Sequence, residues 1–151
     1  MTWRLVVSVM LTGLLVSGGS AVSADQFDID RYRGSVVIVD FWASWCVPCR
    51  RSFPWYNAMQ DKYGDKGLII VAVNLDAEPE AAEDFLAEYP PRFEIIYDES
   101  KDLARDYEVV AMPTSYLIGR DGDIRERHFG FKVKKQEEYE AAIVAALGEQ
   151  E

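Results

Sequence analysis

The sequence predicts a single α/β domain with a mixed central sheet and helices on both faces of that sheet. Two apolar, β-branched runs at 35–42 and 68–75 are typical of strands buried on both faces. A helical pattern over about 47–63 lies between them. Because a strand, a helix and a strand of these lengths form a crossover unit, the two strands are expected to be parallel.

The remaining elements follow in order, each from a local pattern of apolar residues and turn residues. The expected elements are a helix over 79–89, a strand over 93–97, a short helix capped by Ser100 and ending at Tyr107, a strand over 114–118, a charged edge strand over 124–129 after the Asp121-Gly122 turn, and a last helix with Tyr139, Ala142, Ile143, Ala146 and Leu147 on one face.

The size and charge of the chain restrict its class. Its 151 residues, 49% of them hydrophobic, are enough for one domain with a core. It carries 26 acidic against 16 basic residues and a net charge of −10. Since binding to nucleic acid needs a basic surface, we do not expect nucleic acid as a partner.

Residues 1–24 have the pattern of a secretory signal peptide. Arg4 is followed by an apolar run from Leu5 to Val16, and Val22-Ser23-Ala24 has small residues at the positions that a signal peptidase recognises. The apolar run is shorter than the roughly 20 residues of a membrane span, and an uncleaved N-terminal anchor is the alternative. Both interpretations place the folded domain, 25–151, in the periplasm or another extracytoplasmic space.

The two cysteines of the chain, Cys46 and Cys49, follow a buried strand and stand at the start of a helix. Residues three apart in a helical turn are about 5–6 Å apart, which matches the span of a disulfide. The partial positive charge of a helix N-terminus favours thiolate. We therefore expect Cys46 to be the attacking thiolate and Cys49, one turn further in and less exposed, to resolve the mixed disulfide.

Two simpler interpretations of the cysteine pair are less favourable. A zinc site needs four ligands, and the chain has no other Cys and a single His, His128, which we expect at the surface. A purely structural disulfide would close a very short loop, which constrains the unfolded chain little. We therefore predict no metal and no cofactor beyond the redox-active pair itself.

Asp40 is the third candidate catalytic residue. It lies in the apolar strand six residues before Cys46. Burying a carboxylate costs free energy unless it is protonated, hydrogen-bonded or used in chemistry. We interpret Asp40 as a proton acceptor and donor for Cys49. The alternative is that the strand ends at Val39 and Asp40 is solvated.

The segment Val39 to Arg50 (VDFWASWCVPCR), with Pro54 after it and Met112-Pro113-Thr114 later, resembles the thioredoxin superfamily. Ala43 to Cys49, the long arm before Pro113 and the ending SYLIGRDGDIRERHFGF are similar to the TlpA/ResA-like branch of exported thioredoxins tied to cytochrome c or oxidase maturation. The resemblance covers essentially the whole predicted domain. Asp40 departs from it, since many members of this branch carry Asn there.

This resemblance implies a thioredoxin fold with an inserted helix and strand, which 79–97 would supply. It also implies that Pro113 is cis and faces the cysteines, and that Met112 offers its backbone to a client by strand addition. Spacing alone would leave Pro113 an ordinary loop proline. The client-binding set that we predict is Trp45, Val47, Pro48, Met112 and Pro113.

The predicted function is that of a thiol–disulfide oxidoreductase, most consistent with a reductant of client disulfides. The Val47-Pro48 dipeptide has no His between the cysteines, which favours a reductant over an oxidant. We expect a monomer with disulfide-containing client proteins and a membrane electron donor of the DsbD/CcdA type.

Two other functions remain as alternatives. Copper handling would require Met112 or His128 to approach the cysteines. A binding module with inert thiols would use an apolar surface around Trp42, Trp45 and Trp55. Separately, the acidic segment from Asp76 to Glu108 is expected to be a solvated helical face, with a docking site for a basic client as the alternative.

Overall fold

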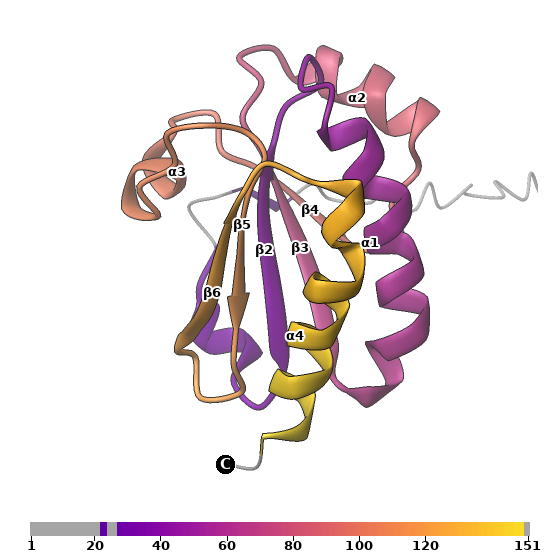
Figure 1. Cartoon of the computed structure of the whole chain (residues 1–151). Helices are drawn as coiled ribbons and strands as arrows, with labels where there is room; N and C mark the ends of the chain where they lie inside the picture. The colour runs from indigo at the N-terminus through magenta and orange to yellow at the C-terminus, as the bar shows by residue number, and fades with distance from the viewer. Residues whose placement is uncertain (1–21, 24–26, 150–151) are drawn as a thin grey trace, which may run out of the picture.

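In the computed structural model, which describes residues 22–23 and 27–149, the strands form one mixed sheet (Figure 1). Among these residues, the sheet has six strands in the order β1-β4-β3-β2-β5-β6. The strands are β1 (Val22–Ser23), β2 (Val36–Trp42), β3 (Leu68–Asn74), β4 (Glu94–Tyr97), β5 (Thr114–Ile118) and β6 (Ile124–Phe129). β1, β4, β3 and β2 are parallel, whereas β5 and β6 are antiparallel to their neighbours.

The helices lie on both faces of this sheet, as predicted (Figure 1). α1 (Cys49–Tyr63) and α4 (Gln136–Gly148) cover one face, and α3 (Asp102–Asp106) lies on the other. α2 (Pro79–Glu88) packs beside the N-terminal end of α1. The short 3-10 turns are η2 (Ile29–Tyr32), η3 (Gly64–Lys66) and η4 (Val133–Lys135).

Strand β2 is the centre of the fold. All seven of its residues are buried, because β3 and β5 flank it and helices cover both faces. Its alternate residues Val37, Val39 and Phe41 enter the core beneath α3, and Val36 and Ile38 enter the core beneath α1 and α4. By the same alternation, Asp40 faces α1 and α4.

The acidic segment from Asp76 to Glu108 is not a uniformly solvated face, which corrects the sequence interpretation. Asp98 is completely buried, and its carboxylate accepts the backbone N–H of Ala104 at 2.8 Å. It therefore caps α3 more closely than the predicted Ser100, whose hydroxyl accepts the N–H of Asp102 at 3.3 Å. Asp76 is also buried.

The predicted signal peptide, 1–24, lies mostly outside the described residues. Its two described residues, Val22 and Ser23, pair in parallel with Ile96 and Tyr97 at the edge of the sheet. Cleavage of the leader stays a prediction. Within 22–23 and 27–149, none of the helices has the length and apolar character needed to cross a bilayer.

Candidate functional site

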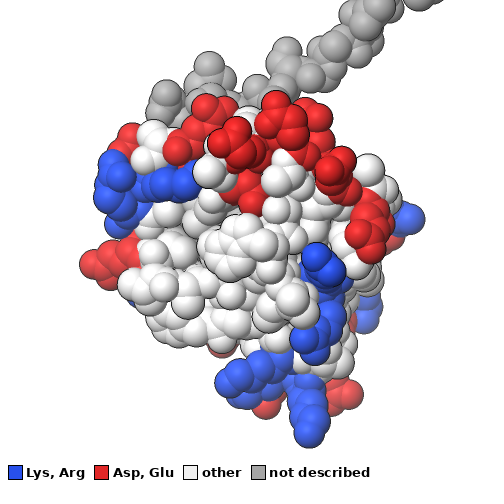
Figure 2. Space-filling view, turned by 90° about the horizontal axis from the view of Figure 1, so that it is seen from above, with Lys and Arg blue, Asp and Glu red and all other residues white. Residues whose placement is uncertain are grey.

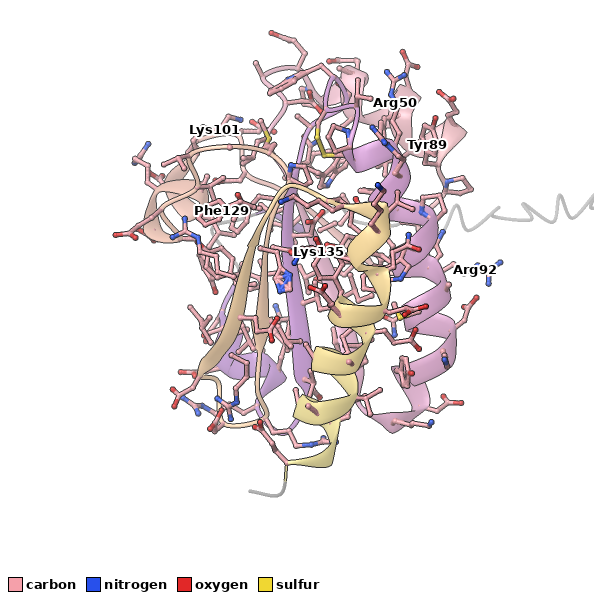
Figure 3. The ribbon with its side chains drawn as sticks, in the orientation of Figure 1. Arg50, Tyr89, Arg92, Lys101, Phe129 and Lys135 are labelled. Atoms are coloured by element: carbon pink, nitrogen blue, oxygen red, sulfur yellow. A yellow bond between two sulfur atoms is a disulfide. The ribbon has the colours of Figure 1, made fainter. Side chains whose placement is uncertain are left out.

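The two cysteines form a disulfide at the N-terminal end of α1 (Figure 3). Their Cα atoms are 5.3 Å apart, in agreement with the distance expected for a CxxC turn. The carbonyl of Cys46 accepts the N–H of Cys49, the first residue of α1. Cys46 thus lies in the turn that leads into the helix, one turn outside Cys49, as the sequence predicted.

The start of α1 offers positive charge to the disulfide. The helix has no side-chain hydrogen bond at its N-terminal cap and no acidic residue in its first turn. Arg50 and Arg51 are both exposed and follow Cys49 directly. The positive end of the helix dipole and these two guanidinium groups therefore favour an anionic sulfur at this position.

The disulfide packs on an aromatic cluster formed largely by α1 and α2. Cys46 is 3% exposed and Cys49 is 0% exposed. Both pack with Trp42, Phe53 and Phe85, whose ring centroids lie 4.7–4.9 Å apart. Phe85 comes from α2, so the inserted segment contributes side chains to the cluster that packs against the disulfide. The sequence analysis did not predict this role of Phe85.

An uncharged surface surrounds the disulfide. Trp45 is 65% exposed and Val47 is 57% exposed, although large apolar side chains are usually covered. Seen from the end of the molecule where α1 begins, uncharged residues occupy the middle of the face, with acidic residues along one edge (Figure 2). Trp42 is fully buried and Trp55 is half-buried against Phe131, so of the three tryptophans considered for a client surface only Trp45 is largely exposed.

The Met112–Pro113 peptide bond is cis, as the family resemblance implied. Met112 packs against the cluster that contains Cys46 and Cys49, which brings this loop to the disulfide. The carbonyl of Pro113 accepts the N–H of Gly130 at 2.7 Å, and the Thr114 hydroxyl donates to the carbonyl of Ala111 at 2.7 Å. The first bond ties the Met112–Pro113 loop to Gly130, the residue after β6, and the second closes the turn from Ala111 to Thr114.

A buried acidic residue holds the loop before Cys46. The Asp76 carboxylate accepts the backbone N–H of Ser44 at 2.9 Å and the Ser44 hydroxyl at 2.8 Å. It also accepts the side-chain N–H of Asn74 at 2.7 Å. Asp76 thus joins the end of β3 to the active-site loop. Sequence reasoning missed this pair because the two residues are 32 positions apart.

Asp40 is completely buried in β2, which excludes the solvated alternative. The Tyr56 hydroxyl donates to its Oδ1 at 3.0 Å, and its Oδ2 has no hydrogen-bond partner among the described residues. Burial raises the pKa of Asp40 to about 8, and the bond from Tyr56 opposes that rise. Asp40 is therefore protonated near neutral pH.

The partner of Asp40 on α1 is Tyr56, not Cys49. Tyr56 lies seven residues after Cys49, about 10 Å along the helix axis. Burial and the neighbouring Asp40 raise the pKa of Tyr56 well above its ordinary value, whereas a hydrogen bond with Ser115 lowers it. The sequence analysis did not predict the Asp40–Tyr56 pair, whose members are 16 positions apart on different elements.

No group of three or more His, Cys, Asp or Glu side chains within 22–23 and 27–149 is arranged to hold a metal ion. Copper handling would require either Met112 or His128 to approach the cysteines, and Met112 does pack against the cysteine cluster. His128 instead lies in β6, where its ring stacks on Tyr139 of α4 with 4.6 Å between centroids. His128 is therefore half-buried, and the sequence had placed it at the surface.

Known proteins resemble this chain over most of its length. A family profile described as Redoxin matches residues 18–143. The thiol-disulfide oxidoreductase ResA of Bacillus thuringiensis subsp. konkukian is 32% identical over 115 residues, which are 76% of this chain and 66% of the relative. The thioredoxin-like protein YneN of Bacillus subtilis is 33% identical over a match that covers 78% of this chain and 69% of that relative. The chain thus spans just under two thirds of the ResA length.

Solved structures of similar proteins are consistent with these sequence relatives. A Chlorobium tepidum structure assigned to a thiol:disulfide interchange protein DsbE has a TM-score of 0.77 and 50% identity, covering 80% of this chain and 85% of that one. StoA from Bacillus subtilis has a TM-score of 0.63 and 27% identity, covering 73% and 83%. The chain therefore belongs to the redoxin family, and its fold and CxxC motif place it in the TlpA/ResA-like branch of the thioredoxin superfamily.

Proposed function

We propose that this protein is a thiol–disulfide oxidoreductase that reduces disulfides of client proteins outside the cytoplasm. The observation that carries the proposal is the Cys46–Cys49 disulfide at the uncapped N-terminal end of α1, with the cis Pro113 loop packed beside it. Relatives named thiol-disulfide oxidoreductase and thiol:disulfide interchange protein support it.

The reaction transfers two electrons from the protein to the client. The Cys46 thiolate attacks one sulfur of the client disulfide, forms a mixed disulfide and releases one client thiolate. The Cys49 thiolate then attacks Cys46, the mixed disulfide breaks, and the second client thiolate leaves. The client ends reduced, and the protein ends with the disulfide seen in the structure.

Asp40 supplies or accepts the proton of Cys49 in this scheme. In the oxidised protein the carboxyl is protonated near neutral pH, so it can donate a proton when a reductant opens the disulfide and Cys49 leaves. Once ionised, it can accept that proton when Cys49 attacks. Tyr56, which donates a hydrogen bond to Asp40 and lies on the same helix as Cys49, can take part in this transfer.

The client-binding surface is proposed to be Trp45, Val47, Pro48, Met112 and Pro113. Trp45 and Val47 are exposed next to Cys46, and Met112 packs against the cysteine cluster. The β5 strand begins directly after Pro113, so an extended client segment could add backbone hydrogen bonds along this loop. We propose clients of the cytochrome c or oxidase maturation type and a monomeric protein.

A reductant outside the cytoplasm must itself be reduced, and we propose a membrane electron donor of the DsbD/CcdA type. The first experiment is to equilibrate the protein in redox buffers and follow the fluorescence of Trp42, which packs against both cysteines. A reduction potential of about −220 mV or lower supports a reductant, and one of about −120 to −180 mV assigns an oxidant or isomerase. A pair that does not cycle overturns the proposal and favours copper handling or simple binding.

Two substitutions test the order of attack. Cys49→Ser should accumulate a mixed disulfide between Cys46 and the client, because the resolving thiolate is absent. Cys46→Ser should form no such adduct and should lose client reduction. Retained client reduction in Cys46→Ser would contradict the role of Cys46 as the attacking thiolate, and an adduct formed through Cys49 instead would reverse the assigned roles.

A further inference from the structure

Three polar residues form one row across the sheet, on the face covered by α1 and α4. Asp40 in β2 pairs with Ser115 in β5, and Ser115 pairs with His128 in β6. Directly paired residues of antiparallel strands point to the same face of a sheet. The row therefore leads from the completely buried Asp40 to the edge strand, where the His128 side chain is 18% exposed.

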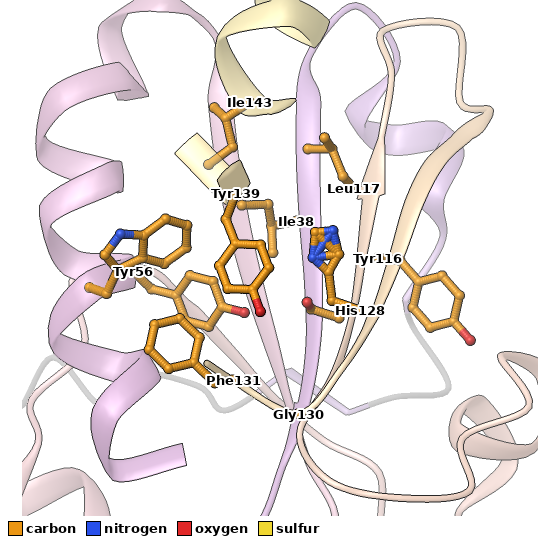
Figure 4. Close-up of a pocket in the computed structure, with 11 residues that line it drawn as sticks. Ile38, Tyr56, Tyr116, Leu117, His128, Gly130, Phe131, Tyr139 and Ile143 are labelled. Atoms are coloured by element: carbon orange, nitrogen blue, oxygen red, sulfur yellow. The ribbon is translucent and has the colours of Figure 1, made fainter. Parts of the chain in front are cut away.

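A small cavity lies over this row (Figure 4). Ser115 and His128 line it from the sheet, Tyr56 from α1 and Tyr139 from α4. Its volume is about 30 Å³, and about 10–15 Å³ is enough for one water molecule. The cavity can therefore hold one or two waters between hydroxyl groups and an imidazole.

Hydrogen bonds link the inner end of the row to this cavity. The Tyr56 hydroxyl donates to Asp40 and is itself hydrogen-bonded to Ser115. At the outer end, His128 Nε2 lies 2.7 Å from an oxygen of Glu126, a side chain that is 48% exposed. Polar groups thus continue from the buried carboxyl to the solvent-facing surface of β6.

On the side toward the disulfide, Asp40 is followed by apolar side chains and not by a row of polar groups. Trp42 is the next residue of β2 on the same face, and it packs with Phe53 and the two cysteines. This cluster is apolar apart from the indole N–H of Trp42, which has no hydrogen-bond partner among the described residues. A proton moving between Asp40 and solvent therefore meets better partners along the row than through the cluster.

We propose that the row Asp40–Ser115–His128, with Tyr56 above it, is the route by which Asp40 exchanges its proton with solvent, and that His128 is the proton-exchanging group at its outer end. For proton uptake, Tyr56 gives its hydroxyl proton to Asp40 Oδ1. Tyr56 regains a proton from Ser115 or from water in the cavity, and protonated His128 replaces that proton. One proton moves and no electron is transferred.

The groups around His128 suit this role. Glu126 lies beside it in β6, Lys135 lies near it at the end of η4, and Tyr139 stacks on it from α4. Burial lowers the pKa of His128, Glu126 raises it, and Lys135 lowers it further. Since imidazole titrates near neutral pH and this shift is downward, the ring is mainly neutral there and releases a captured proton readily.

The use of this route rests on the proposed function, because only redox turnover makes Asp40 give up and regain a proton. The existence of the route does not depend on that function, so the oxidised protein can be used to test for it. We would label the aspartates with ¹³C at the carboxyl carbon, assign Asp40 with Asp40→Asn, and measure its proton-exchange rate from NMR line shapes near pH 8. This measurement of the Asp40 exchange rate does not depend on whether water occupies the cavity.

His128→Gln should slow this exchange by about 100-fold, the lower end of the effect of a positioned proton-transfer group. Ser115→Ala is the second variant and should also slow it. Val144→Ala is the control: Val144 is exposed on α4 and does not line the cavity, so its truncation should leave the rate unchanged. An unchanged rate in folded His128→Gln and Ser115→Ala overturns the proposal, as does equal slowing in Val144→Ala.

The two proposals fail in different ways. If His128→Gln exchanges as fast as the parent while Cys46→Ser loses client reduction, the oxidoreductase function stands and the route is wrong. If His128→Gln slows exchange but the cysteine pair does not cycle in redox buffers, the route stands and the function is wrong.

Discussion

The hydroxyl of Tyr56 on α1 donates a 3.0 Å hydrogen bond to the carboxyl of Asp40 on β2, and both side chains are buried. This bond joins the helix that begins with Cys49 to the central strand of the sheet. A change at either residue therefore affects stability as well as the chemistry of the site. The first two predictions separate these effects.

Asp40 should make the protein less stable as pH rises. Its folded-state pKa of about 8 is above its ordinary value of 3.8, so the folded protein binds this proton more tightly than the unfolded chain. The stabilisation from that proton is complete below pH 3.8 and is lost as pH rises to about 8. Between pH 5 and pH 9 this loss amounts to about 4 kcal/mol.

Asp40→Asn has no such proton to lose. Relative to Asp40→Asn, the parent protein should therefore be destabilised by about 4 kcal/mol more at pH 9 than at pH 5, measured from urea unfolding of the oxidised forms. Asp106→Asn is the control, since Asp106 is exposed. An equal pH dependence in the parent and in Asp40→Asn would mean that Asp40 is ionised in the fold.

Tyr56→Phe should raise the pKa of Asp40 further above 8. The hydroxyl of Tyr56 stabilises the charged carboxylate, and its removal leaves Oδ1 as unpaired as Oδ2 already is. The free energy of unfolding should also fall by about 1–3 kcal/mol at pH 7. A ¹³C titration of the carboxyl measures the first effect, and a pKa below that of the parent would contradict it.

The Asp76–Ser44 pair should show strong coupling in a double-mutant cycle. Asp76→Ala leaves three donors without their acceptor and should cost about 2–4 kcal/mol, whereas Ser44→Ala should cost about 1 kcal/mol. Because the residues share hydrogen bonds, the double variant should be more stable than the sum of single effects predicts. Asp84→Ala on the exposed face of α2 is the control, and its effect should simply add to that of Ser44→Ala. Full additivity of Asp76→Ala with Ser44→Ala would show that Asp76 and Ser44 are not coupled.

Trp45→Ala should weaken client binding without changing the redox chemistry. Trp45 is 65% exposed beside Cys46 and is not part of the buried cluster. Steady-state reduction of a protein client should show KM raised about tenfold, with kcat and the reduction potential unchanged. Val144→Ala, which trims another exposed apolar side chain on α4, should change none of these. A shifted potential would instead assign Trp45 a role in setting the stability of the disulfide.

Strong local patterns were enough to predict most of the fold. The strand Val36–Trp42 and the helix Cys49–Tyr63 agree with their predicted ranges within one or two residues, because long apolar runs and helical spacing are local signals. The cap of α3 was predicted only in part. The Ser100 hydroxyl accepts the N–H of Asp102 at 3.3 Å, but the Asp98 carboxylate accepts the N–H of Ala104 at the shorter distance of 2.8 Å.

The sequence by itself determined the fold class and the cysteine pair, because both are encoded in neighbouring residues, whereas the cis form of Pro113 was implied only by the family resemblance. The tertiary structure alone decided the partners: Asp76 for Ser44, Tyr56 for Asp40, and His128 at the end of the row from Asp40 through Ser115. These partners come from separate strands and helices. Their meeting depends on strand order, register and helix packing, which no local pattern records.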